Sequence, residues 1–199
     1  MSTAPRPALT RSDLLSLENY ASERAAFRAR AIAHKRQRSF ALGEHMTLLF
    51  EDRLTVQYQV QEMLRIERIF EPQAIQEELD AYNPLISDAD NLKATLLIEF
   101  TDPVERTRML AQWRGIEHRV FLQASADEKC FASADEDLDR SNESKTSAVH
   151  FLRFPIDAGI HAAIAAGAAL SFGIDDARYP QSLQIPSERA RALLAPPAA

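Results

Sequence analysis

Hydrophobic and polar positions follow helical periods in some stretches of the chain and strand periods in others, without any repeated unit. Helical patterns fall at residues 10–34, 53–69, 72–82, 103–113, 157–166 and 187–194. Strand patterns fall at 39–42, 46–50, 93–100, 119–124, 129–133, 147–156 and 168–174. Because hairpins mix with helices and no βαβ unit recurs, the order predicts the α+β class: a single domain whose largely antiparallel sheet packs with about five helices.

Cap and turn residues mark several of the expected boundaries. Thr10 and Asp13 have the spacing of a capping box, which predicts that the first helix begins there. Gly43 followed by Glu44 predicts a two-residue type II′ turn between the first two strands. Pro72 suits the first position of a helix. We expect a disordered N-terminal tail at 1–9, one domain at 10–194 and a disordered C-terminal tail at 195–199.

Composition narrows the class of protein more than it identifies a function. The chain has 199 residues, a net charge of −6 and one cysteine, Cys130. A single cysteine excludes an internal disulfide, which fits a reducing compartment, and no apolar run has the roughly 20 residues of a membrane helix. We therefore expect a cytoplasmic protein without membrane association. The acidic balance disfavours general binding to nucleic-acid phosphates, and Cys130 has no base beside it, so we expect an inert thiol.

The helix at 53–69 carries one candidate for acid–base or metal chemistry. Successive steps of 100° give one apolar arc that includes Val56, Val60, Met63 and Ile66, and we expect this arc to pack on a sheet. Glu67 falls inside the arc, whereas Gln61 lies on the wet side. A carboxylate that faces a core must be paired, protonated or bound to a cation. Glu67 is therefore a candidate acid, base or ligand, one half of a structural ion pair with an arginine, or part of a helix end that extends past the rim of the core. We expect it to be mostly buried and within salt-bridge distance of a cation.

Two histidines could join Glu67 in one centre. His45 follows the first hairpin turn, and His150 shares a strand face with Leu152 and Phe154. Imidazole and carboxylate groups together suit iron, manganese or zinc. No HExxH, ExxH or HxH spacing occurs, however, and a lone histidine on an apolar strand is more often structural. His45, Glu67 and His150 are thus the candidate catalytic and metal residues, while we expect no metal and no cofactor. We also expect His45 and Glu67 to lie on the same side of the domain.

The acidic and hydroxyl-rich segment that follows residue 134 resembles two ligand loops without matching either. The run at 135–139 opens like a calcium loop, but Arg140 and Thr146 occupy the positions that need glycine and glutamate. We expect no calcium there. Lys145 and Thr146 are similar to the end of a phosphate loop, but the required glycines are missing.

A basic stretch at the end of the first helix is the main candidate for partner binding. Its members are Arg24, Arg28, Arg30, Lys35, Arg36 and Arg38. Such a charge run could dock an acidic partner, pair with the acidic segment of the same chain or bind RNA. Because no aromatic platform is interleaved, we favour docking or intramolecular pairing, and expect no tight nucleic-acid binding.

Four long strings of sequence resemble one bacterial family. They are residues 43–50 (GEHMTLLF), 61–68 (QEMLRIER), 77–85 (EELDAYNPL) and 141–154 (SNESKTSAVHFLRF). Together they are similar to domain of unknown function family 3501 over nearly the whole chain. The resemblance assigns no reaction, but it implies a setting beside rubrerythrin-like and iron–sulfur redox proteins.

Three functions follow as expectations, in order of preference. The first is a non-catalytic accessory or binding protein of a cytoplasmic redox or iron system, with a redox or iron–sulfur protein as partner; a homo-oligomer is compatible with it. The second is a small metal-dependent or acid–base enzyme that uses a His/Glu centre. The third is an RNA-associated protein that uses the basic stretch.

Overall fold

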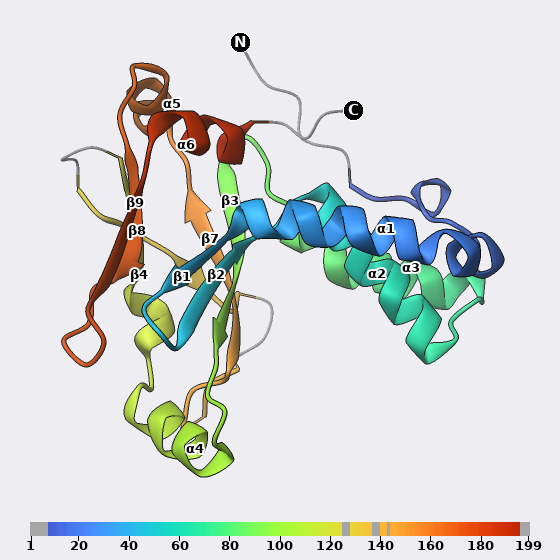
Figure 1. Ribbon diagram of the computed structural model, residues 1–199, viewed down its shortest axis with the longest axis horizontal. Helices are drawn as coiled ribbons and strands as arrows, with labels where there is room; N and C mark the ends of the chain where they lie inside the picture. The colour runs from blue at the N-terminus through green and yellow to red at the C-terminus, as the bar shows by residue number, and fades with distance from the viewer. Residues whose placement is uncertain (1–7, 125–127, 137–139, 143, 196–199) are drawn as a thin grey trace.

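The strands form two antiparallel sheets that pack against each other in the computed structural model (Figure 1), which describes residues 8–124, 128–136, 140–142 and 144–195. The five-stranded sheet has the order β1 (Ser39–Leu42), β2 (Met46–Phe50), β3 (Asn91–Ile98), β7 (Val149–Pro155), β6 (Ser133–Ala134). The four-stranded sheet has the order β5 (Cys130–Phe131), β4 (Val120–Ala124), β8 (Leu170–Ile174), β9 (Gln181–Ile185). The predicted α+β class and antiparallel pairing are confirmed.

The main core lies between the two sheets because each strand alternates its side chains between two faces. Leu92, Ala94, Leu96 and Ile98 of β3 all point into it and are buried. Phe172 of the other sheet lies at the centre of an aromatic cluster, with ring centroids 4.8 Å from Phe40 and 5.5 Å from Phe50. Three helices border the sheets: α4 (Pro103–Gln112), α5 (Ala158–Ala165) and α6 (Ser187–Leu194). We call the sheets and these helices the β-lobe.

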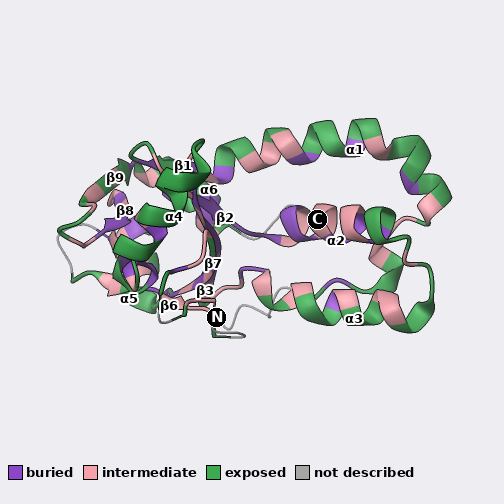
Figure 2. Ribbon diagram, turned by 90° about the horizontal axis from the view of Figure 1, so that it is seen from below, coloured by how far each residue is buried: buried purple, intermediate pink, exposed green. Residues whose placement is uncertain are grey.

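Three further helices project from one end of the β-lobe as a helical arm, made of α1 (Leu17–Arg38), α2 (Arg53–Glu67) and α3 (Pro72–Tyr82). The arm has a separate small core, formed by Leu9, Val56, Val60, Leu64, Leu79 and Ile86. Figure 2 shows that the outer faces of α1 and α3 are largely exposed, whereas α2 is mostly buried or intermediate. The expectation that α2 packs its apolar face on a sheet is therefore wrong, because α1 and α3 cover that face instead.

The N-terminal boundary differs from the prediction. The Asp13 carboxylate accepts hydrogen bonds from the backbone N–H of Thr10 at 2.7 Å and from its hydroxyl at 2.8 Å, but this cap closes only the 3₁₀ turn η1 (Arg11–Asp13). The long helix begins after Ser16, whose hydroxyl accepts the Asn19 N–H at 3.2 Å. Leu9, placed in the predicted tail, is buried in the arm, whereas residues 1–7 and 196–199 lie outside the described part.

The first hairpin forms at the predicted strands with a longer loop. Leu42 pairs with Met46, so three residues occupy the loop where two were expected. Gly43 has φ +71°, and a Cβ atom there would collide with the Tyr179 hydroxyl. That hydroxyl donates to the Leu42 carbonyl at 2.8 Å and accepts the His45 N–H at 3.0 Å, which joins the hairpin to the loop before β9.

The remaining elements agree with the sequence patterns, apart from two strands. Pro72 and Pro103 begin α3 and α4, and the Asp102 carboxylate caps α4 by accepting the Val104 N–H at 2.8 Å. Short 3₁₀ turns lie at η2 (Asn83–Leu85) and η3 (Ile116–Arg119). Neither β6 nor β9 was predicted: β6 has two residues, and β9 has intermediate or exposed positions except at Ile185.

Candidate ligand-binding site

The three predicted centre residues are not brought together. His45 lies in the loop between β1 and β2, and its ring stacks on Phe100 with centroids 4.1 Å apart. Glu67 is the last residue of α2, in the arm, and α2 continues away from the hairpin instead of returning over it. His150 is fully buried in β7. Within the described part of the chain, no group of three His, Cys, Asp or Glu residues is placed to hold a metal ion.

The prediction turned the wrong side of α2 toward the interior. Glu67 is exposed, and Ile66, which the arc also placed inward, is 57% exposed. Gln61, expected on the wet side, is fully buried, and its side-chain oxygen accepts the Leu15 N–H at 2.6 Å. The cause is that α1 and the segment before it cover a side of α2 that faces no sheet.

The carboxylate with the strongest partners on α2 is Glu62. It accepts hydrogen bonds from the Tyr20 hydroxyl at 2.7 Å and from Arg24 Nε and Nη2 at 2.8 and 2.9 Å, with a weaker contact to Arg65. The hydrogen bonds from Arg24 hold the pKa of Glu62 at about 2, below its ordinary 4.5. This is a structural ion pair that ties α1 to α2, of the kind expected for Glu67.

Some members of the basic stretch are held by ion pairs within the chain, and others are exposed. Besides Arg24, Arg38 is engaged, because it is 7% exposed, donates from Nε to the Phe50 carbonyl at 2.9 Å and lies 3.4 Å from Asp52. The carboxylates beside these two arginines, Glu62 and Asp52, thus belong to or border α2 and lie outside the acidic segment. Arg30 lies over the Phe27 ring and Lys35 over the Tyr58 ring. Arg28 and Arg36 are exposed, and partner docking there stays a prediction.

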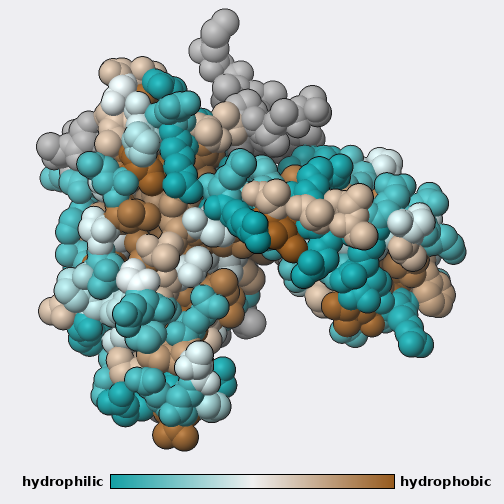
Figure 3. Space-filling view, viewed as in Figure 1, coloured by the Kyte–Doolittle hydropathy of each residue, from teal (hydrophilic) through white to brown (hydrophobic). Residues whose placement is uncertain are grey.

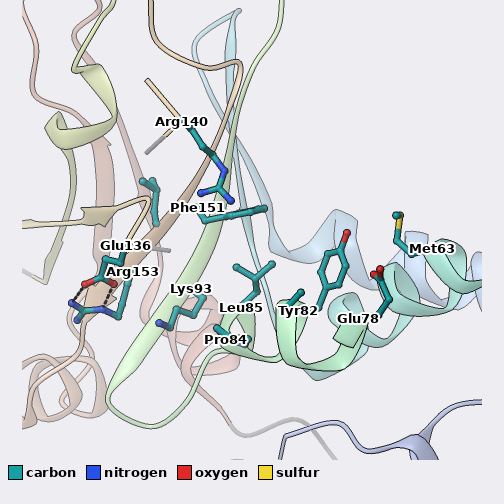
Figure 4. A pocket seen from close by; sticks show the side chains of 12 residues that line it. Met63, Glu78, Tyr82, Pro84, Leu85, Lys93, Glu136, Arg140, Phe151 and Arg153 are labelled. Carbon is teal, nitrogen blue, oxygen red and sulfur yellow. Dashed lines mark hydrogen bonds and ion pairs between the residues drawn. The ribbon is translucent and has the colours of Figure 1, made fainter. Parts of the chain in front are cut away.

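A pocket of about 410 Å³ lies where the arm meets the outer face of the five-stranded sheet (Figure 4). The arm contributes apolar walls from Met63, Tyr82 and Leu85, together with the carboxylate of Glu78. The sheet side contributes Lys93, Glu136, Arg140, Phe151, Leu152 and Arg153. Its size falls within the usual range for small-molecule sites, and its lining mixes apolar groups with a few charges, as such sites do.

Strand register places two cations side by side in this pocket. Lys93 on β3 pairs directly with Arg153 on β7, so both side chains stand on the same face. Like charges directly opposite one another destabilise a sheet unless an anion lies between them. Glu136 forms an ion pair with Arg153, and its carboxylate accepts from Arg153 Nε and Nη2 at 2.7 and 2.6 Å. Figure 4 shows this pair together with the Lys93 amine that points toward it.

The Lys93 amine is the member of this cation pair that has no carboxylate bound to it among the described residues. It is half-buried, and among the described residues it has no hydrogen bond or ion pair. Burial, with help from the nearby Arg153, lowers the pKa of Lys93 below its ordinary 10.5, while Glu136 and Asp88 oppose the shift. A half-buried cation of this kind gains most from an anion that enters the pocket.

Arg140 forms the upper wall. Its guanidinium lies 4.4 Å from the centroid of the Phe151 ring and donates from Nη1 to the Asp135 carboxylate at 3.3 Å.

Asp137 and Asp139 lie outside the described residues, so the absence of calcium binding at 135–139 stays a prediction. Sequence reasoning missed the pocket because its walls come from five separate segments. The one available signal was the outward face of two strands, Lys93 on one and Arg153 on the other.

Cys130 stands apart from the pocket. Burial raises the pKa of its thiol, and the negative charge of Asp157 acts in the same direction. The sulfur lies 3.6 Å from the Pro155 carbonyl oxygen. Both features favour the protonated thiol, in keeping with the inert role expected from the sequence.

Two packed antiparallel sheets, a projecting helical arm and a mixed apolar and cationic pocket at their junction define a two-lobed α+β protein. The chain belongs to the family described as protein of unknown function (DUF3501), which matches residues 8–196. It is similar to the crystal structure of a protein of unknown function from Burkholderia pseudomallei K96243, with 49% identity and a TM-score of 0.88. That match covers 94% of this chain and 98% of the other. No curated protein matches the chain, and no helix among the described residues could span a membrane.

Proposed function

We propose that this protein is a binding protein for a small, partly apolar organic anion, which enters the pocket between the arm and the five-stranded sheet. The observation that carries the proposal is the cross-strand pair of Lys93 and Arg153, which has Glu136 bound to one member and no described partner for the other. An anionic head group beside Lys93 would complete the charge balance of the pair.

The apolar wall defines the rest of the ligand. Phe151 and Leu85 face the pocket from the sheet and from η2, and Tyr82 and Met63 extend this surface along the arm. Burying an apolar ligand body here gains about 25 cal/mol per Å² of surface removed from water. The Glu78 carboxylate, on the arm side, disfavours a second negative charge at that end. The geometry therefore fits a ligand with one anionic end and one apolar end.

A pair of fluorescent probes tests the proposal. One is 1-anilinonaphthalene-8-sulfonate, an aromatic anion, and the other is N-phenyl-1-naphthylamine, which has the same rings without the sulfonate. We expect the anion to bind more tightly, and Lys93→Gln to weaken the anion about tenfold while leaving the neutral probe unchanged. Lys145→Gln is the matched control, because Lys145 is exposed and does not line the pocket. Equal affinity for the two probes, or no effect of Lys93→Gln, would refute the proposal.

The pH dependence adds a second test. A lysine binds an anion in its charged form, which is present below its pKa. Because burial lowers the pKa of Lys93, affinity for the anionic probe should decline, as pH rises, before an ordinary lysine with a pKa of 10.5 would lose its charge. Lys93→Gln should remove this decline, whereas Lys145→Gln should retain it.

The setting of this binding activity rests on the family resemblance alone. We propose on that basis that the protein serves a redox or iron system as an accessory rather than as the enzyme. Elemental analysis of protein purified without a histidine tag tests the division between the two. We expect no stoichiometric iron or zinc, and a full equivalent of either metal would favour the metal-dependent enzyme instead.

A further inference from the structure

A cluster of buried polar groups lies directly behind the pocket wall. His150 is fully buried on the inward face of β7, and Glu117 of η3 is 2% exposed. His150 Nδ1 lies 2.6 Å from Asp135 Oδ2, and its Nε2 lies 2.9 Å from the Thr146 hydroxyl. The Thr146 hydroxyl in turn donates to Glu117 Oε2 at 2.8 Å, and the Ser141 hydroxyl donates to Glu117 Oε1 at 2.6 Å.

Both ring nitrogens of His150 face groups that accept. Nδ1 faces a carboxylate oxygen, and Nε2 lies 3.0 Å from the Ser147 carbonyl, which can only accept. Because the Thr146 hydroxyl donates its single proton to Glu117, its oxygen can only accept from His150 Nε2. Two donating nitrogens require the doubly protonated ring. An imidazolium is therefore placed between two carboxylates, Asp135 on one side and Glu117 on the other, and this arrangement allows all three groups to remain buried.

Glu117 has the electrostatic character of an ionised partner. Burial raises its pKa, but hydrogen bonds from Ser141, from backbone and from Thr146, together with the His150 charge, outweigh burial and leave the pKa below its ordinary value.

Asp135 connects the cluster to the pocket. Its backbone adopts φ +52°, a left-handed conformation that non-glycine residues rarely hold without compensating contacts. Those contacts are its backbone N–H, which donates to the Phe151 carbonyl at 2.8 Å, and its Oδ1, which accepts the Phe151 N–H at 3.0 Å. The same Oδ1 accepts from Arg140 Nη1 at 3.3 Å. One carboxylate thus holds a buried histidine with one oxygen and a pocket arginine with the other.

We infer that His150 is a positioning residue for the pocket: as a buried imidazolium it fixes the Asp135 carboxylate, which holds Arg140 over Phe151 to receive the anionic end of the ligand. This inference rests on the proposed function. The anion contacts Arg140 and Lys93, and His150 acts only through Asp135.

The protonation of His150 is tested on the wild-type protein. In a long-range proton–nitrogen correlation spectrum of uniformly ¹⁵N-labelled protein at neutral pH, the His150 ring should show two protonated nitrogens. The signal is assigned by its loss in His150→Gln. One unprotonated ring nitrogen would overturn the imidazolium assignment, and with it the inference.

The positioning role is tested by a double-mutant cycle with the anionic probe. Asp135→Asn is the first variant, because asparagine tolerates the left-handed backbone and retains an oxygen for the Phe151 N–H. We expect Asp135→Asn and Arg140→Gln each to weaken the anionic probe about tenfold, and the double variant to be no weaker than either alone. The uncharged probe should bind all of them equally.

Two histidine variants add a geometric control. An asparagine amide can place its nitrogen near the position of Nδ1, whereas a glutamine amide reaches the position of Nε2. His150→Asn should therefore keep more affinity for the anionic probe than His150→Gln, at matched thermal stability. A purely structural histidine would not make this distinction. If wild type prefers the anion and Arg140→Gln loses it while Asp135→Asn does not, the positioning inference fails and the proposed function stands. If wild type shows no preference for the anion, the proposed function fails first.

Discussion

The helical arm and the β-lobe differ in how they close their interiors. Among the described residues, the hydrophobic cluster of the arm has six buried members and that of the β-lobe has 26. The arm adds polar contacts: Gln61 of α2 accepts the Leu15 N–H of the segment before α1, and Glu62 of α2 accepts from Arg24 and Tyr20 of α1. Apolar burial is insensitive to pH, whereas a charged hydrogen bond is lost when its acid is protonated. The comparison teaches that the arm depends on Glu62 and its charged hydrogen bonds, whereas the β-lobe depends mainly on the volume that its apolar side chains fill.

The largest expected effect is in the β-lobe. Phe172→Ala removes the ring at the centre of the aromatic cluster and should lower the free energy of unfolding by about 3–5 kcal/mol. Urea denaturation followed by the fluorescence of Trp113, a buried β-lobe residue, measures it. Leu79→Ala, in the arm core, is the control, with a smaller loss and an unchanged folded-state Trp113 spectrum. A larger loss for Leu79→Ala would reverse the comparison.

Next comes the ion pair of the arm. Glu62→Gln replaces the acceptor of Arg24 and Tyr20 and should cost about 2 kcal/mol, because hydrogen bonds to charged groups are the stronger ones. Hydrogen exchange should speed up in α1 and α2 while the amides of β3 and β8 stay protected. Glu67→Gln on the same helix is the matched control: its side chain is exposed, and we expect a change within about 0.5 kcal/mol. Equal effects of the two variants would contradict the assignment of Glu62 as the structural acid.

The acid response of the arm follows from the same residue. The pKa of Glu62 is about 2 in the folded protein and 4.5 ordinarily, so its stabilising contribution is complete above pH 4.5 and is lost as pH falls toward 2. The difference in unfolding free energy between wild type and Glu62→Gln should shrink over that window. Urea melts monitored by helical circular dichroism at several pH values measure it. A difference that persists unchanged at pH 2 would show that the contact is not ionic.

The smallest expected effect concerns the exposed apolar residues at the end of the arm. Ile66 is 57% and Phe70 is 67% exposed. In Figure 3, the surface of the arm carries hydrophobic patches among hydrophilic side chains. Replacing Ile66 or Phe70 by serine should change the unfolding free energy by no more than about 0.5 kcal/mol. Val60, on another side of α2, is fully buried. Val60→Ala should therefore lower the unfolding free energy clearly more in the same thermal melts. A large loss for Ile66→Ser would mean that the predicted helical arc was right after all.

Local patterns predicted most of the elements but not their partners. The proline starts of α3 and α4 and the alternation on β3 are short-range features, so the sequence was sufficient for them. The position of α2 was not, because an apolar arc has the same form whether it meets a sheet or two helices. The same ambiguity misplaced Glu67 and concealed Glu62.

The pocket was beyond the reach of sequence patterns for a related reason. Lys93 and Arg153 become neighbours only through the register of β3 and β7, which are separated by α4 and β4 to β6. His150 was correctly placed on the inward strand face, but its partners Asp135 and Glu117 come from a loop and a 3₁₀ turn. Long-range register and loop conformation therefore determine this site, and neither has a local signature.

The topology of the arm has a consequence for the order of folding. The chain leaves the five-stranded sheet after β2, builds α2 and α3, and returns to pair β3 directly with β2, so that Phe50 stands opposite Ala94. Forming that pair closes a loop that contains both helices, and the entropic cost of closure rises with loop length. If α2 and α3 collapse on each other first, the effective loop is shorter and the two strand ends are brought together. We therefore expect α2 and α3 to pack together early and β2 to pair with β3 afterwards. The arm would then act as the template on which the sheet is completed.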